Sequence, residues 1–396
     1  MEQSRNPAEG LLRDPNLWVI FAVTLMVVMG VASVAPALPV VQTALGVGPE
    51  EVTLLVTAFT LPGVFLTPIF GILGDRYGRK VVLVPGLVLF AFAGFACTFT
   101  PSFPALCGLR VLQGIGSAPL GALNLTLAAD LYEGRRRDAA LGYNQTALAM
   151  GAAIYPALGG ALAVLGWFAP FYLPLLALPV AAAVAYGLRL PPRDGRALPL
   201  RAYLRSLRHA LGDPRVLALF GMTLCTFVFL YGAVITWLPE LMSHRFHASS
   251  EFIGVVIGSE ALASGIASAF LGRLAGMVRR STLVAVGFGL FALSTLLFPT
   301  LPSPGALFVP ALLFGAGMGL DLPATTALIA ELVPAEQRAA LLAVNGTVLR
   351  LGQTVGPLLA AGAYLAGGFA AVYVGTAVLA VAVALGILLG FRGSAL

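Results

Sequence analysis

The chain has 396 residues, of which 59% are hydrophobic and only 10% are charged, and its mean hydropathy is +0.94. A soluble domain needs about 25% charged residues to cover its surface, so this composition excludes a soluble globular protein and indicates a chain that lies largely in lipid. The net charge of +6 does not indicate nucleic-acid binding, because the basic residues are confined to particular loops between apolar segments.

Long apolar runs follow one another, and each is close to the roughly 20 residues that a helix needs to cross about 30 Å of hydrocarbon. The runs are continuous rather than alternating, which is not typical of a membrane β-barrel. The sequence therefore predicts an all-α membrane protein with about twelve transmembrane helices. In chain order the predicted spans are 17–41, 51–72, 81–100, 104–128, 139–164, 168–189, 215–239, 252–274, 282–300, 305–330, 339–364 and 368–391.

The basic residues predict the orientation of these spans. All but three of the 23 Lys and Arg residues lie near the N-terminus, in the even-numbered loops or near the C-terminus; the exceptions are Arg110, Arg245 and Arg350. Under the positive-inside rule, both termini and the even-numbered loops are expected to be cytoplasmic, which requires an even number of spans.

The two halves of the sequence resemble each other at an offset of 201 residues, as from Gly71 to Gly272. This offset places the second span on the eighth, so the halves are predicted to be parallel six-helix repeats. Residues 1–189 and 215–396 would form the two bundles, and 190–214 a basic cytoplasmic linker on the anionic inner leaflet. Further matching pairs are Gly114/Gly315, Gly116/Gly317, Asp130/Glu331, Arg137/Arg338, Asn144/Asn345, Gly151/Gly352 and Pro156/Pro357.

The loop between the second and third spans reads GILGDRYGRKVVL from Gly71 to Leu83. Its Asp75 is suited to the positive N-terminal end of a neighbouring helix, where Arg79 would hold it. This loop resembles the signature of the major facilitator superfamily, in which such a contact latches the two halves on the cytoplasmic side. The resemblance implies a gating motif made of Gly71, Asp75, Arg76, Gly78, Arg79, Lys80 and Asp130.

The fourth and fifth spans extend the resemblance. Arg110, Gln113, Gly114 and Gly116 match the family's fourth-span signature. The fifth span resembles that of family exporters, including drug–proton antiporters, with Tyr155 where that signature has glycine. The resemblance implies close helix packing through Gly142, Gly151, Pro156, Gly159 and Gly160, and through Gly356 and Pro357 in the second half. The drug antiporters also suggest an acidic residue in the first span, but Gly30 lies near that place.

Four ionisable residues lie well inside predicted spans, and each costs at least about 2.5–3.5 kcal/mol at a helix centre. At the repeat-equivalent positions the other half has apolar residues, which favours a functional over an architectural role. The alternative is a set of buried ion pairs, for example between Asp321 and Arg350. The four residues are Arg110, Glu260, Asp321 and Arg350.

A carboxyl without a firm partner in the membrane favours its neutral form and is suited to carry a proton. Asp321 and Glu260 are therefore the predicted proton-coupling residues. Arg110 would adjust them or bind an anionic substrate group, and Arg350 is a second candidate for anion binding. Polar or aromatic candidates for the substrate cavity, each as readily explained by helix packing, are Asn124, Gln145, Tyr155, Tyr231, Trp237 and Gln353.

No cofactor or metal is predicted. His244 and His247 share the expected outer loop between the seventh and eighth spans with Glu240 and Glu251, but a solvated loop is the simpler interpretation. The sequence contains no phosphate-binding loop or nucleophile triad, so neither an enzyme nor an ATP-driven pump is expected.

The function expected from the resemblance is proton-coupled efflux of a small amphipathic molecule or drug by a monomer in the bacterial inner membrane. The lipid bilayer and the small-molecule substrate would be its partners, without nucleic acid. Two alternatives remain: uptake or facilitated diffusion of a small organic anion or metabolite, and a non-transporting receptor with this fold.

Overall fold

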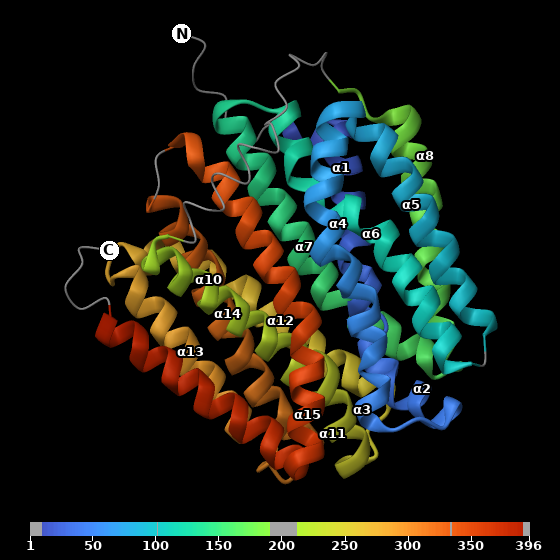
Figure 1. The fold of residues 1–396 in the computed structure, drawn as a ribbon, viewed down its shortest axis with the longest axis vertical. Helices are drawn as coiled ribbons and strands as arrows, with labels where there is room; N and C mark the ends of the chain where they lie inside the picture. The colour runs from blue at the N-terminus through green and yellow to red at the C-terminus, as the bar shows by residue number, and fades with distance from the viewer. Residues whose placement is uncertain (1–9, 101, 191–211, 333–334, 391–396) are drawn as a thin grey trace.

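The computed structural model describes residues 10–100, 102–190, 212–332 and 335–390 of the chain. Every regular element in these ranges is helical, so the prediction of an all-α protein is confirmed. Most of the predicted linker and both chain ends lie outside the described residues. Figure 1 shows two groups of long helices side by side, blue to green for the first half and yellow to red for the second.

The first half contains α1 to α8 with short 3-10 and π segments. Its elements are η1 (Leu11–Arg13), α1 (Pro15–Ala32), η2 (Ala35–Ala37), α2 (Leu38–Leu45), α3 (Pro49–Val52), α4 (Leu54–Tyr77), α5 (Arg79–Ala96), η3 (Cys97–Phe99), α6 (Phe103–Leu131), α7 (Gly134–Ala163), η4 (Ala169–Leu176), α8 (Ala177–Ala182) and η5 (Ala183–Gly187).

The second half repeats this plan with fewer breaks. Its elements are α10 (Pro214–Phe229), the π-helical η6 (Leu230–Thr236), α11 (Trp237–Phe246), α12 (Ser250–Ala275), α13 (Arg280–Leu297), η7 (Pro304–Leu307), α14 (Phe308–Glu331) and α15 (Ala335–Gly390).

Eleven helical stretches among the described residues are long and apolar enough to cross a membrane. The last of them, Leu341–Gly390, has 50 residues, which at 1.5 Å per residue would be about 75 Å long, more than twice the hydrocarbon thickness. The helical geometry breaks at Gly367 and Gly368, and Figure 1 shows that α15 turns back there. Gly368 has φ 65°, a conformation that glycine adopts without steric cost.

Two ends of the molecule are distinguished below by their residues. The basic end carries the α4–α5 turn with Arg79 and Lys80 and the start of α7 with its arginines, and the distal end carries α2, α3 and α11. At the basic end the Tyr132 hydroxyl donates a hydrogen bond to Asp14 over 2.8 Å, which ties α6 to the start of α1. Burial and this hydrogen bond raise the pKa of Tyr132 above its usual range, so the phenol stays a donor.

One predicted boundary is wrong. The expected outer loop begins at Glu240, directly after the predicted span 215–239, but α11 continues the helix of the seventh span to Phe246. Trp237, Leu241 and Met242 are buried along α11, and this packing holds the segment helical. Glu240 is consequently only 4% exposed rather than solvated.

Candidate functional site

The surface between the two halves is closed at the distal end. There α7 of the first half lies against α12 of the second, and three glycines make the approach possible. A Cβ added at Gly160, Gly254 or Gly258 would overlap a backbone carbonyl of the facing helix. Further along the same pair, a Cβ at Gly265 would lie at an ordinary 3.6 Å from the Ala149 side chain.

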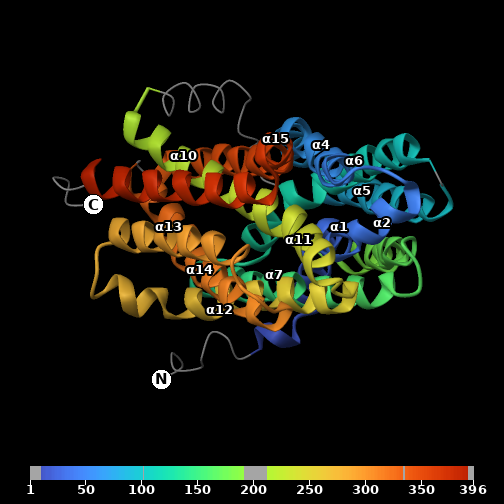
Figure 2. The same cartoon turned by 90° about the horizontal axis from the view of Figure 1, so that it is seen from below.

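The same surface opens toward the basic end. Gly142 lies seven residues before Ala149 on α7, and Gly272 lies seven residues after Gly265 on α12, so both are on the side of their helix that faces the other half. An added Cβ at either glycine would have no atom within 4 Å. The helices α4 and α15 are likewise in contact away from the basic end and separated near it. The Thr57 hydroxyl donates to the Thr354 carbonyl over 3.2 Å, whereas a Cβ at Gly71, nearer the basic end of α4, would meet nothing within 4 Å. Figure 2, seen from the distal end, shows α11 in the middle of the molecule beside first-half helices.

Arg350 lies on α15 at the middle of this surface and reaches the first half. A Cβ at Gly121 of α6 would overlap its Nη2 atom, and a Cβ at Gly63 of α4 would lie 3.4 Å from its Cδ atom. Its side chain is partly exposed, and Nη1 lies 3.5 Å from the Gln353 Oε1 atom. Its guanidinium therefore sits between three helices of both halves.

Other polar groups surround Arg350. The Tyr231 hydroxyl, from the π-helical η6, lies against the Gln353 side chain and close to the Arg350 guanidinium. The Thr67 hydroxyl, one turn from Gly63 on α4, is buried and has no hydrogen-bond partner among the described residues. We call Thr67, Tyr231, Arg350 and Gln353 the central cluster. It contains three of the residues that the sequence nominates for the substrate cavity.

Asp321 lies inside the second half, 1% exposed, between α14 and α10. Thr226 of α10 donates to its Oδ2 atom over 2.6 Å, and Thr325 donates to Oδ1 over 2.9 Å. The Thr226 hydroxyl also lies 3.0 Å from the Met222 carbonyl. The alternative of an ion pair between Asp321 and Arg350 is not formed, since neither has a charged partner among the described residues.

Glu260 is 6% exposed on α12, in the second half. Its backbone lies against Gly315 of α14, where a Cβ would overlap the Glu260 carbonyl. In the part of the chain that the structure describes, its carboxyl has neither a hydrogen-bond nor an ion-pair partner. An ionised carboxylate in such surroundings is costly, so the position favours the neutral acid.

Arg110 differs from Arg350 in its surroundings. It is 0% exposed and enclosed by the first half. Nε donates to the Leu55 carbonyl over 3.2 Å, Nη1 donates to Gln113 over 2.7 Å, and the Phe59 ring lies 4.4 Å from its Cζ. These contacts hold α4 against α6, and they place Arg110 away from the surface between the halves.

Asn124 also serves a contact within the first half. Its Oδ1 atom lies 3.0 Å from the Thr24 hydroxyl of α1, which also contacts Asn144 of α7. All three side chains are buried. This neutral knot joins the first, fourth and fifth spans, as Asp321 joins the seventh and tenth.

The remaining candidates from the sequence lie apart from the central cluster. Gln145 is exposed toward the basic end of α7. Tyr155 is buried, with its ring against Gly151. Trp237 is buried at the distal end, where its ring lies 4.3 Å from that of Tyr364 and its Nε1 atom has no partner among the described residues.

The residues of the loop signature are joined within the first half. Arg79 contacts Asp75 over 2.6 Å and Asp130 over 2.9 Å, and so links α4, α5 and α6. Gly78 has φ 113° in the turn between α4 and α5. The Lys80 ammonium donates to the Ala185 carbonyl over 3.0 Å, and Arg76 packs over Tyr77.

The second half has an equivalent ion pair, between Arg280 and Glu331, at the repeat positions of Arg79 and Asp130. At the position equivalent to Asp75 the second half has Gly276, so it lacks the aspartate of the signature. The structure shows that the pair between the third and fourth spans of each half is kept despite that replacement.

The fifth-span glycines pack on two different partners. Gly151 lies against Leu25 of α1 and Gly159 against the Ser33 backbone, both within the first half. Pro156 and Gly160 contact α12 of the second half. The repeat-equivalent Gly352 lies against α10, as does Gly356, which precedes Pro357. The motif therefore supports both bundle packing and closure of the distal end.

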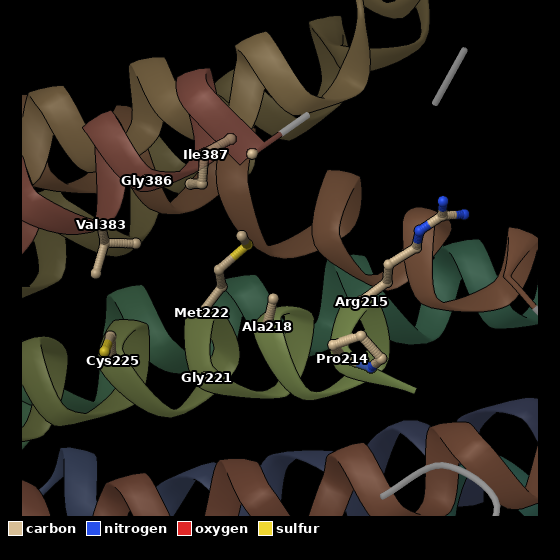
Figure 3. A pocket seen from close by; sticks show the side chains of 10 residues that line it. Pro214, Arg215, Ala218, Gly221, Met222, Cys225, Val383, Gly386 and Ile387 are labelled. Carbon is tan, nitrogen blue, oxygen red and sulfur yellow. The ribbon is translucent and has the colours of Figure 1, made fainter. Parts of the chain in front are cut away.

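A groove of about 490 Å³ lies between α10 and the last turns of α15, within the second half (Figure 3). Arg215 and Pro214 lie at one end of it and Cys225 at the other. Small residues, Ala218 and Gly221 among them, line the path between. Cys225 precedes Thr226, the donor to Asp321, and its thiol lies within range of a charge–charge interaction with the Asp321 carboxyl.

The sequence reasoning missed Thr226, Thr325 and Glu240. The threonines have no signal of their own, since hydroxyls are common in membrane helices. Glu240 has a signal in the sequence, because it follows Trp237 by three residues, but the predicted span ends before it. In the structure both residues lie on α11, and the Glu240 Oε1 atom is buried without a hydrogen-bond partner among the described residues. Among the described residues, no group of three or more His, Cys, Asp or Glu side chains is suited to hold a metal ion.

Comparison with known proteins agrees with this architecture. The chain is 29% identical over 354 residues to the bacillibactin exporter of Bacillus subtilis (strain 168), covering 86% of this chain and 88% of that protein. It is 26% identical over 377 residues to the multi-drug resistance efflux pump PmrA homolog of Lactococcus lactis subsp. lactis (strain IL1403), covering 91% of each.

Solved structures share the fold at low sequence identity. A crystal structure of the nucleoside transporter NupG has a TM-score of 0.80 at 13% identity and covers 95% of this chain and 100% of that one. An inward-facing, occupied bacterial homolog of the human lysosomal transporter Spinster has a TM-score of 0.77 at 16% identity, covering 99% and 98%. The sequence model of the Major Facilitator Superfamily matches residues 20–241 and 227–394. The chain is therefore a multi-pass membrane transporter, not an enzyme, and belongs to the Major Facilitator Superfamily.

Proposed function

We propose that the chain is a proton-coupled exporter of a small amphipathic molecule that works by alternating access. The observation that carries the proposal is the graded surface between the halves, which is in backbone contact at the distal end and open toward the basic end. A transporter whose halves rock must hold such a state and its opposite. The names of the relatives, an exporter and multi-drug efflux pumps, support export as the direction.

In this proposal the basic end faces the cytoplasm, as the positive-inside rule requires. The α15 hairpin then counts as two spans, which gives twelve helices in all and cytoplasmic termini. Residues 1–189 and 215–396 are the two rocking bundles of a monomer in the bacterial cytoplasmic membrane, and 190–214 links them. The structure would be the inward-open state, with the distal end closed toward the outside.

Asp321 is the proposed proton-carrying residue, because its hydrogen bonds suit both protonation states. When the carboxylate is ionised, Thr226 and Thr325 both donate to it. When it is protonated, its own O–H donates to Thr226, whose hydroxyl proton turns to the Met222 carbonyl 3.0 Å away. Neither state leaves an unpaired donor in this site, so a proton is gained or lost at low reorganisation cost.

The groove between α10 and α15 would give water a route to this carboxyl from the cytoplasm. It begins at Arg215 near the basic end and ends at Cys225, beside Thr226. Protonation from the other side would require the opposite state of the halves. Glu260, which lacks a partner among the described residues, is the second proposed coupling residue on the neighbouring α12.

The test uses purified protein in proteoliposomes with a pH dye in the lumen. A panel of lipophilic cations, neutral drugs and organic anions is added outside, and proton movement is recorded for each. The proposal expects at least one compound to trigger saturable proton movement that vanishes in Asp321→Asn. Saturable flux of a compound without proton movement would instead show a facilitator, and proton movement that persists in Asp321→Asn would refute the assignment of this residue.

A further inference from the structure

Arg350 is the unbalanced charge of the surface between the halves. It sits beside Gly63 and Gly121 of the first half, so its guanidinium is not buried within its own bundle. The buried carboxyls of the second half, Asp321, Glu260 and Glu240, do not pair with it in the described structure. Among the described residues its guanidinium donates one hydrogen bond, to the Gln353 amide oxygen over 3.5 Å, the limit of a hydrogen bond.

The scaffold does not need a cation at this place. The repeat-equivalent residue of the first half is Ala149, which packs against Gly265 by its methyl group alone. The other arginine of the membrane interior, Arg110, is held at Nε and Nη1 by a carbonyl and an amide and lies against an aromatic ring, while its Nη2 atom has no partner among the described residues. A guanidinium inside the membrane region that has only one long hydrogen bond is costly unless an anion joins it.

Two further donors lie near the guanidinium. The Tyr231 hydroxyl faces Gln353 and Arg350, and the buried Thr67 hydroxyl has no partner among the described residues. A guanidinium and two hydroxyls are a donor set with no carboxylate in it. Such a set is complementary to a carboxylate or a similar anion, which accepts several hydrogen bonds at once.

We propose that the central cluster, with Arg350 as its charged member, is an anion-binding subsite that selects substrates carrying a negatively charged group. This inference rests on the proposed function, because it names the substrate class of the pathway between the halves. Arg350 forms the ionic contact, Tyr231 and Thr67 donate hydrogen bonds to the same anion, and Gln353 holds the tyrosine. Since Arg350 contacts α4 and α6, a bound anion bridges groups from both halves.

The test measures binding in detergent, without any gradient, by saturation-transfer difference NMR. Three probes of one size and shape are compared: benzoate, benzamide and benzamidine, which are negative, neutral and positive. Wild-type protein is expected to bind benzoate at least about tenfold more tightly than the other two, a difference of about 1.4 kcal/mol. Arg350→Gln is expected to lose that preference, and Arg350→Lys to keep part of it.

The matched control is Arg273→Gln, which removes an exposed arginine of α12 and should leave the preference for benzoate unchanged. Benzamide binding and the thermal unfolding midpoint show whether each variant is folded. Equal binding of the three probes by wild-type protein, or a benzoate preference that survives in folded Arg350→Gln, would overturn the inference. Because no proton gradient is involved, a benzoate preference without proton coupling would overturn the proposed coupling and leave the subsite standing.

Discussion

Replacing Asp321 by asparagine removes a proton site while keeping the shape and hydrogen bonds of the side chain. The amide oxygen accepts from Thr325, and the amide nitrogen donates to Thr226, whose hydroxyl turns to the Met222 carbonyl. None of these bonds is lost, but the second N–H of the amide has no acceptor among the partners of this side chain, so the variant should be destabilised by about 1–3 kcal/mol. The coupling should disappear: one proton moving through one pH unit supplies about 1.36 kcal/mol, which sustains a tenfold substrate gradient.

The assay follows a transported compound in proteoliposomes whose lumen is one pH unit more acidic than the bath, with the membrane potential held at zero by potassium and valinomycin. Antiport by wild-type protein should concentrate the compound about tenfold in the lumen, since each molecule enters as a proton leaves. Asp321→Asn should reach equal concentrations on both sides, and the exposed Asp138→Asn should behave as wild type. A tenfold gradient in Asp321→Asn would refute the assignment, and depletion of the lumen by wild type would indicate symport.

Three further outcomes follow from the packing. Gly160→Val should hold the distal end open, because overpacking of about 1–3 kcal/mol shifts the equilibrium between the closed and the open distal end at least about fivefold. Spin-label distances between α2 and α11 should lengthen in this variant. Gly142→Val, in open space on the same helix, should not change these distances. Arg110→Gln should lower the thermal unfolding midpoint without altering selectivity among the benzoate probes, since all its contacts lie in the first half. Gly221→Leu should fill the groove and slow proton exchange while substrate binding stays within about twofold.

The helices were predictable from hydropathy because each span must satisfy its own backbone hydrogen bonds in lipid. The outer boundary of the seventh span was not predictable from hydropathy. Glu240 lowers the local hydropathy, yet burial of Trp237, Leu241 and Met242 keeps α11 helical beyond it. Hydropathy measures what a segment would do against lipid, and it does not detect a carboxyl covered by protein.

The interior charges could be found from the sequence, but their surroundings could not. Arg110 and Arg350 look alike in a hydropathy plot, and both replace an apolar residue of the other repeat. The structure separates them because the direction in which a side chain leaves its helix decides whether it faces its own bundle or the other half. The surroundings of Asp321 were not predictable either, because its hydrogen-bond partner Thr226 lies 95 positions away in the chain.

The two repeats differ in the groups that join their helices, and this difference matters for the proposed proton coupling. In the first half, α1, α6 and α7 are joined by Thr24, Asn124 and Asn144, a knot of neutral groups with no proton to exchange near neutral pH. In the second half a carboxyl at Asp321 joins the corresponding α10 and α14, and in the proposed function it gains and loses a proton while it keeps these hydrogen bonds. A symmetric pair of titrating bundles would respond alike to a proton and favour neither side. If Asp321 is the coupling residue, protonation changes the charge of the second bundle alone, and the surface between the halves, where Arg350 lies, is where that change of charge would reach the substrate.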